Sequence, residues 1–166
     1  MHPADTPNLE QVAHPAVAEA FHNHGGVQFK CYAIGAHVHC AVKASIGDVG
    51  CSADSSGEAL IDGCSVPCSP PHMVTFDSLK TLPLARSPEL AAAAPPEAAV
   101  LQACADAIRR RLGLALFGFD LIRSLRTPER YVLIDVNAFP SYKGHDGAAA
   151  ELRALVKQAA RERAVN

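Results

Sequence analysis

Short apolar runs alternate with turn-forming residues in two parts of the chain. Residues 27–34 and 37–42 are rich in β-branched, aromatic and other apolar residues, and Gly35-Ala36 between them suits a tight turn. Two further apolar runs cover residues 114–122 and 131–136. The pattern predicts two antiparallel pairs of strands.

Two other stretches repeat their apolar residues at the spacing of a helix. In the first, Pro96 suits the opening turn, and Gly113 is a residue type that commonly ends a helix. The second covers residues 147–165, where apolar and charged residues fall on opposite faces. Helices are therefore predicted before and after the second pair of strands.

Two regions lack this periodicity. Residues 1–15 contain three prolines and are predicted to form a flexible lead-in. Residues 44–95 hold clusters of Ser, Gly and Pro, which predict a long loop or insertion. The predicted fold class is α/β (α+β): one domain over residues 16–166, with an antiparallel sheet and helices packed on one face.

Charge and cysteine content narrow the function classes. The chain has 15 Lys and Arg against 17 Asp and Glu, whereas domains held to nucleic acid by bulk charge are usually strongly basic. No apolar run approaches the roughly 18–20 residues that cross a bilayer, and residues 1–10 lack the pattern of a secretory signal. The six irregularly spaced Cys are interpreted as reduced thiols. We expect a cytoplasmic protein with no nucleic-acid partner and no membrane span.

Three oxygen-bearing side chains give the strongest chemical signal. Asp120 lies in an apolar run, and Asp135 and Asn137 lie two residues apart, so the latter two share one face of a strand. If the two runs pair as a hairpin, Asp120 falls nearly opposite Asp135. A carboxylate on an apolar strand is costly unless it is paired or metal-bound, and Mg²⁺ prefers oxygen ligands. The alternative is that these are polar groups at strand ends, bonded to backbone or to a nearby Arg.

A glycine pair before the first strand gives a second, weaker signal. Gly25 and Gly26 let a ligand approach the backbone closely. Lys30, on the strand that follows, can offer a positive charge to phosphate. An ordinary loop followed by an exposed strand lysine explains the same residues.

A zinc site is a further alternative. Its candidate ligands are His37, His39, Cys40, Cys51, Cys64 and Cys68. Their spacing lacks the paired pattern that is typical of zinc-binding sequences. Alternating strand positions and loop thiols are the simpler interpretation.

Two segments resemble a known family. The first reads FHNHGGVQFK from Phe21 to Lys30 and is followed by Tyr32. The second reads LFGFD up to Asp120 and is followed by IDVNAFPSY from Ile134 to Tyr142. In this order and separation they resemble the inositol 1,3,4-trisphosphate 5/6-kinase (inositol-tetrakisphosphate 1-kinase) family, which has an ATP-grasp fold. The resemblance covers residues 16–165, and it covers only the C-terminal half of the family's enzyme.

The resemblance implies an ATP-dependent kinase that transfers the γ-phosphate, with Mg²⁺, to a hydroxyl of an inositol tris- or tetrakisphosphate. The implied ATP-binding residues are Glu19, Ala20, Phe21, His24, Lys30 and Ser45; the Mg²⁺ ligands are Asp120, Asp135 and Asn137; and the substrate-binding residues are Lys30, Asn137 and Ser141. Lys30, Asp120 and Asp135 are the implied catalytic residues, acting mainly through positioning and charge neutralisation.

The sequence departs from the family pattern at three places. Glu19 stands where the family usually has Gln, and Ser141 stands where a Gly normally follows Ala-Phe-Pro. The segment 42–46 lacks the family's Arg, and its Lys43 supplies a charge without the bidentate fork of a guanidinium. The last two departures bear on substrate handling more than on nucleotide binding.

The absent half leaves two other functions open. An incomplete half-enzyme would act as a nucleotide-binding or interaction module without activity of its own, docking on a polypeptide that supplies the missing N-terminal lobe. An ATP-grasp ligase that joins a carboxylate to an amine shares the pattern of Asp120, Asp135 and Asn137 but not the surrounding sequence.

Overall fold

The computed structural model describes residues 15–17, 19–48, 84 and 88–165. The elements follow in the order β1 (Val27–Ile34), β2 (His37–Ala44), α1 (Pro88–Ala92), α2 (Ala98–Leu112), β3 (Leu116–Arg123), β4 (Tyr131–Asn137) and α3 (Ala148–Val165). All four predicted strands and both predicted helices form, with small shifts at their ends.

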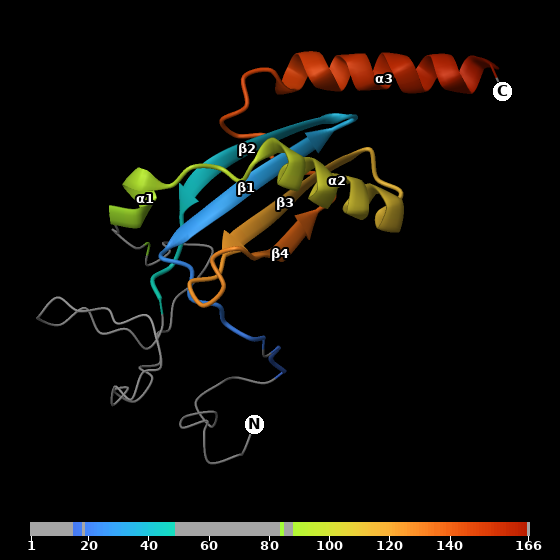
Figure 1. Cartoon of the computed structure of the whole chain (residues 1–166). Helices are drawn as coiled ribbons and strands as arrows, with labels where there is room; N and C mark the ends of the chain where they lie inside the picture. The colour runs from blue at the N-terminus through green and yellow to red at the C-terminus, as the bar shows by residue number, and fades with distance from the viewer. Residues whose placement is uncertain (1–14, 18, 49–83, 85–87, 166) are drawn as a thin grey trace, which may run out of the picture.

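The strands form one sheet in the order β2-β1-β3-β4, and every neighbouring pair is antiparallel (Figure 1). The two outer pairings, β1 with β2 and β3 with β4, are the predicted hairpins. The turn of the first hairpin places Gly35 at φ +58, in the left-handed region that glycine adopts readily. Pairing of β1 with β3 joins the hairpins and brings residues about 90 positions apart in the sequence side by side.

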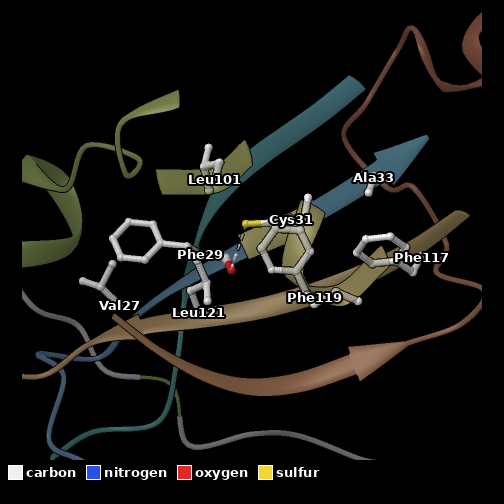
Figure 2. Packing of buried hydrophobic residues seen from close by; sticks show 10 residues of the cluster. Val27, Phe29, Cys31, Ala33, Leu101, Phe117, Phe119 and Leu121 are labelled. Atoms are coloured by element: carbon white, nitrogen blue, oxygen red, sulfur yellow. Dashed lines mark hydrogen bonds between the residues drawn. The ribbon is translucent and has the colours of Figure 1, made fainter. Parts of the chain in front are cut away.

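One face of the sheet is apolar because alternate residues of a strand point to the same side. The residues of β1 and β3 in this core are Val27, Phe29, Cys31, Ala33, Phe117, Phe119 and Leu121 (Figure 2). Helix α2 covers them with Leu101, Ala105 and Ile108, which recur at helical spacing. Each large side chain buried in this way contributes about 1.5–3 kcal/mol relative to an exposed one.

The end of α2 follows the sequence prediction. Gly113 adopts φ +67, and its N–H donates to the Arg109 carbonyl over 2.8 Å. This left-handed residue closes the helix, as glycine commonly does.

Two helices depart from the prediction. Helix α1 forms inside the stretch expected to be loop, because Leu90 packs against the core and that contact comes from the tertiary fold. Helices α1 and α2 lie on the apolar face, as expected. Helix α3 does not: it contacts the sheet near the turn of the first hairpin, where Leu155 lies beside Gly35, and much of its length extends beyond the sheet (Figure 1).

All but the last residue of the predicted lead-in, residues 1–15, and most of the predicted insertion, residues 44–95, lie outside the described residues. Within the described part of that insertion, Ile46 pairs with Leu84 in an isolated antiparallel bridge. Across residues 15–17, 19–48, 84 and 88–165, no helix is long and apolar enough to cross a membrane.

Candidate functional site

The second face of the sheet carries the predicted polar residues. Pairing places Lys30 opposite Asp120, and Asp120 opposite Asp135. Asn137 lies opposite Gly118, two residues along β3 from Asp120. Because directly opposed residues of an antiparallel sheet share a face, these side chains project to the same side. The predicted opposition of the two aspartates is therefore confirmed.

A β-bulge follows Asp120. The register between β3 and β4 shifts by one residue between Asp120 and Leu121, so that Leu121 pairs with Leu133 rather than with Ile134. The shift changes which residues at the start of β4 face the core. Tyr131 thereby packs against the core.

Asp120 lies at the centre of the polar face and is buried, with a side chain 9% exposed. Its Oδ2 accepts a hydrogen bond from Gln28 Nε2 at 2.7 Å and one from Lys30 Nζ at 3.3 Å. Lys30 is only partly covered, with 38% of its side chain exposed. The ammonium group therefore touches both the buried carboxylate and solvent, where a phosphate group would approach.

The electrostatics of Asp120 are unfavourable to its own charge. Burial raises the pKa of its carboxyl above the ordinary value; Lys30 and the Gln28 hydrogen bond oppose the rise, and the nearby negative charge of Asp135 adds to it. A divalent cation between two carboxylates reverses this balance by supplying positive charge.

The donor set fits Mg²⁺. Asp120 and Asp135 supply carboxylates, and within the described part of the chain Asp135 makes no hydrogen bond or ion pair. Asn137 Oδ1 accepts the Phe139 N–H at 2.9 Å and keeps a second lone pair. Two carboxylates and an amide oxygen are hard ligands of the kind that Mg²⁺ takes together with phosphate oxygens and water.

Gln28 is a residue that the sequence analysis did not select. It lies two positions before Lys30 on β1 and donates to Asp120. The alternation of a strand places residues i and i+2 on one face, so its position was readable once Lys30 had been chosen.

Asp48 is a second such residue. Its carboxylate accepts the backbone N–H of His24 at 2.7 Å, and both of its oxygens accept the N–H of Gly25 at 3.1 Å. It thereby holds the glycine turn that leads into β1. No local sequence signal marks it, because it lies 24 residues from His24 and reaches that turn only through the return of β2.

The predicted nucleotide residues fall into two groups. Glu19, Ala20 and Phe21 lie in the exposed segment before β1. His24 is buried, and its Nδ1 lies 2.8 Å from the His22 carbonyl. Ser45 lies against the glycine turn, where its N–H donates to the Gly26 carbonyl at 2.8 Å. The structure thus brings Ser45 and His24 to one turn.

Lys43, the cation that replaces the family's Arg, also faces the polar side. It lies opposite Gln28, two residues along β2 from the position opposite Lys30. Its Nζ lies 4.0 Å from the Cβ position at Gly144, in the segment that follows β4. Two lysine charges thus face the same side of the sheet.

Ser141 lies in that same segment, residues 138–147, which folds back over the polar face. Pro140 contacts Gly118, since a Cβ built on Gly118 would lie 2.8 Å from the Pro140 Cβ. The next residue, Tyr142, contacts the Tyr32 ring at 5.4 Å between centroids. Ser141 is exposed between these two anchored neighbours.

The zinc alternative gains no support in the described residues. Cys51, Cys64 and Cys68 lie outside them. His39 stacks on His145 and on Tyr32 instead of facing Cys40. Among the residues that the structure describes, no group of three or more His, Cys, Asp or Glu could hold a metal, which is consistent with a magnesium site that has only two carboxylates.

A surface cavity of about 460 Å³ lies at the end of the sheet. Its lining residues are His22, Ser124, Thr127, Arg130, Tyr131, Val132 and Leu133. None of them was predicted as a site residue, although His22 belongs to the predicted nucleotide segment. The two carboxylates lie outside this cavity, on the open polar face.

The geometry agrees with a comparison against protein families. Residues 4–155 match the model described as the inositol 1,3,4-trisphosphate 5/6-kinase ATP-grasp domain. The chain belongs to the inositol 1,3,4-trisphosphate 5/6-kinase family. The match to this family begins inside the predicted lead-in and ends in α3.

Curated proteins with this likeness come from plants. The chain is 38% identical over 141 residues to inositol-tetrakisphosphate 1-kinase 1 of Zea mays, covering 81% of this chain and 37% of that protein. It is 38% identical to inositol-tetrakisphosphate 1-kinase 5 of Oryza sativa subsp. japonica, covering 81% and 38% respectively. With inositol-tetrakisphosphate 1-kinase 1 of Arabidopsis thaliana the identity is 34% over 138 residues, covering 83% and 42%. The chain therefore spans about two fifths of the length of these kinases.

Proposed function

We propose that the chain carries the magnesium- and phosphate-binding half of an inositol polyphosphate kinase, which transfers the γ-phosphate of ATP to a hydroxyl of an inositol tris- or tetrakisphosphate. The observation that carries this proposal is the register of the sheet, which aligns Lys30, Asp120 and Asp135 across three strands. Membership of the kinase family supplies the reaction class.

Each residue of this alignment has a role in the proposed reaction. Asp120 and Asp135 hold Mg²⁺, with Asn137 as a third oxygen ligand. The ion, when bound, neutralises charge on the β- and γ-phosphate oxygens. Lys30 lies beside Asp120 and stabilises the negative charge that develops on the transferred phosphoryl group. Gln28 orients the Asp120 carboxylate through its hydrogen bond.

The remaining predicted residues receive roles around this centre. Glu19, Ala20 and Phe21 contact the nucleotide from the segment before β1, and His24 and Ser45 support the glycine turn next to it. On the other side, Asn137 and Ser141 face the inositol phosphate. We further propose a cytoplasmic location, on the basis of the reduced thiols expected from the sequence.

Two observations favour a second function, that of an incomplete half-enzyme. The chain spans 37% of the maize kinase and 42% of the Arabidopsis one, and the polar face is open, with Asp135 exposed. A module that binds Mg·ATP without turning over substrate fits these facts, and so does a half-enzyme that needs a polypeptide to complete the phosphate site. Turnover measured with the chain alone distinguishes the full activity from these alternatives.

Titration calorimetry with Mg·ATP tests the nucleotide site. We expect the wild-type chain to bind, and Asp135→Ala to weaken binding by at least about tenfold, because a ligand of the metal is lost. Asp106→Ala is the matched control: it removes the same charge from a half-buried position on α2, on the opposite face of the sheet. Equal affinity in wild type and Asp135→Ala, or no binding by wild type, contradicts the proposal.

A further inference from the structure

The segment that carries Ser141 is attached to the sheet by a stack of rings outside the metal site. Ring centroids of His39 and His145 lie 4.3 Å apart with an interplanar angle of 12°. Tyr32, opposite His39 on β1, also lies parallel to the His39 ring, at 6.4 Å between centroids and 3°. The stack therefore runs from the centre of the sheet through its edge strand β2 to residue 145, four positions beyond Ser141.

A carboxylate fixes the outer ring of this stack. His145 Nε2 lies 3.0 Å from Glu151 Oε2, in the first turn of α3. Since a carboxylate only accepts hydrogen bonds, His145 carries a proton on Nε2 and donates it. The His145 side chain is 11% exposed and that of Glu151 27%, so the contact is largely shielded from water.

Backbone geometry shows that the segment is held under constraint. Tyr142 adopts φ +53, the only positive φ among non-glycine residues of the described chain, and such a conformation persists when its surroundings enforce it. Tyr32 enforces it from the sheet: its ring contacts Tyr142, and its hydroxyl donates to the Lys143 carbonyl at 3.2 Å. The backbone then returns through a bond from the His145 N–H to the Tyr142 carbonyl.

We propose that His39, His145 and Glu151 are positioning residues, which hold segment 138–147 against the polar face and so fix Ser141 for the inositol phosphate. The substrate part of this inference rests on the proposed function; the structural part does not. Removing the stack releases Ser141 without touching Asp120 or Asp135; Asn137 lies next to the start of the segment and is joined to it by the Phe139 N–H. The inference therefore separates the two ligands: binding of the inositol phosphate depends on the stack, whereas binding of Mg·ATP depends mainly on the two carboxylates.

Four variants of the full chain test the inference. His145→Ser removes the ring, His145→Phe keeps the ring without the bond to Glu151, and Glu151→Gln keeps an uncharged acceptor. His37→Ser is the control, because His37 is an exposed histidine at the start of the same strand β2. Amide hydrogen exchange over residues 138–147 reports the attachment, and calorimetry with inositol 1,3,4-trisphosphate and with Mg·ATP reports the two sites.

We expect His145→Ser to speed exchange over residues 138–147 and to weaken inositol 1,3,4-trisphosphate binding about five- to tenfold, with Mg·ATP affinity within about twofold of wild type. His145→Phe and Glu151→Gln are expected to keep most of the exchange protection and of the inositol 1,3,4-trisphosphate affinity of wild type. His37→Ser is expected to match wild type in both. Rescue by a ring that lacks the imidazole nitrogens identifies stacking as the cause.

The outcomes separate the two ideas. Unchanged exchange in His145→Ser overturns the inference, and so does an equal loss of both ligands in that variant while its fold is intact. If His145→Ser unfolds, a fifth variant decides: His39→Ser removes the central ring of the stack and leaves His145 and Glu151 in place, and exchange over residues 138–147 no different from wild type then overturns the attachment. If wild type binds Mg·ATP but no inositol phosphate, the part of the inference that concerns the substrate is wrong. If wild type binds neither ligand, the proposed function is wrong. In that case hydrogen exchange still tests whether the stack attaches residues 138–147 to the sheet.

Discussion

Asp120 is the residue in which function and stability conflict most directly. It must be ionised to hold a cation, yet burial raises its pKa, so the folded chain without metal disfavours the ionised form. The direction of the pH dependence follows from linkage. The native state binds the Asp120 proton more tightly than the unfolded chain does. The free energy of unfolding therefore falls as pH rises from the unfolded to the folded pKa of Asp120, and it stays lower above both.

Asp120→Asn is therefore expected to unfold at a higher temperature than wild type at pH 7 without metal, because the cost of the buried charge disappears while Gln28 keeps an acceptor. The same variant is expected to lose Mg·ATP binding. Thermal unfolding without ligand measures the melting temperature, and thermal unfolding with about 5 mM Mg·ATP, a millimolar substrate level, measures the binding. A lower melting temperature in the metal-free variant would mean that Lys30 and Gln28 outweigh the burial of the charge.

Asp48 contributes through structure rather than chemistry. Asp48→Ala leaves the N–H groups of His24 and Gly25 without their acceptor, which is expected to cost about 1–3 kcal/mol in the free energy of unfolding. Glu129→Ala is the control, since that carboxylate is exposed in the loop between β3 and β4 and surface substitutions of this kind change stability by at most about 0.5 kcal/mol. Equal costs in urea unfolding would contradict the role given to Asp48.

At the scale of single residues, the sequence pointed to the charged residues of the site and missed a residue that holds the neighbouring turn in place. Asp120, Asp135 and Lys30 were readable because a charged group inside an apolar run needs a partner. Asp48 was not, because its partners are backbone groups 23 and 24 residues away. The roles of Glu19, Ala20 and Phe21 stay predictions that came from the resemblance alone.

At the scale of elements, the close approach of β3 and segment 138–147 is specific to a glycine. Gly118→Ala would place a Cβ 2.8 Å from the Pro140 Cβ, so the segment has to shift. We expect a cost of about 1–3 kcal/mol. Gly47→Ala is the control, because no atom of the described residues lies within 4 Å of its added Cβ, and its effect is expected within about 0.5 kcal/mol. Urea unfolding of both variants measures the difference; a neutral Gly118→Ala would show that Pro140 is not packed there.

The pairing of β1 and β2 also places two thiols in contact, with Cys31 Sγ and Cys40 Sγ 3.4 Å apart. The Cys31 hydrogen bond lowers the pKa of the Cys40 thiol, and that bond together with burial raises the pKa of the Cys31 thiol. Since the thiolate is the nucleophile, iodoacetamide is expected to label Cys40 well before Cys31 in the native chain at pH 8. Peptide mass mapping over time checks the order, and labelling at equal rates would contradict it.

The elements themselves were largely predictable, because period and turn residues are local signals. Gly113 ends α2 as expected, and the tight turn at Gly35 between β1 and β2 forms where predicted. Helix α1 was missed because the contact of Leu90 with the core comes from the tertiary fold, and no local pattern in the sequence indicates it. The position of α3 beyond the sheet was missed because amphipathic spacing identifies an apolar face on a helix. It does not identify the surface against which that face packs.

At the scale of the whole molecule, the chain covers 37% of the maize kinase, and Asp135 on the polar face is exposed to solvent. Phosphoryl transfer depends on positioning both substrates and excluding water, and a misplaced group can cost about a hundredfold. We therefore expect the chain alone to bind Mg·ATP and to phosphorylate inositol 1,3,4-trisphosphate far below the roughly 1–100 s⁻¹ typical of kinases.

If the proposed half-enzyme needs a second polypeptide to complete its phosphate site, adding the part of the maize kinase outside the matched region is expected to raise turnover by about a hundredfold or more. Asp135→Ala mixed with the same maize segment is the control: its inactivity shows that the metal of the active pair is held by this chain. Full turnover by the chain alone shows that the polar face needs no second lobe. Turnover by the mixture that is unaffected by Asp135→Ala shows instead that the carboxylates of this sheet take no part in the reaction.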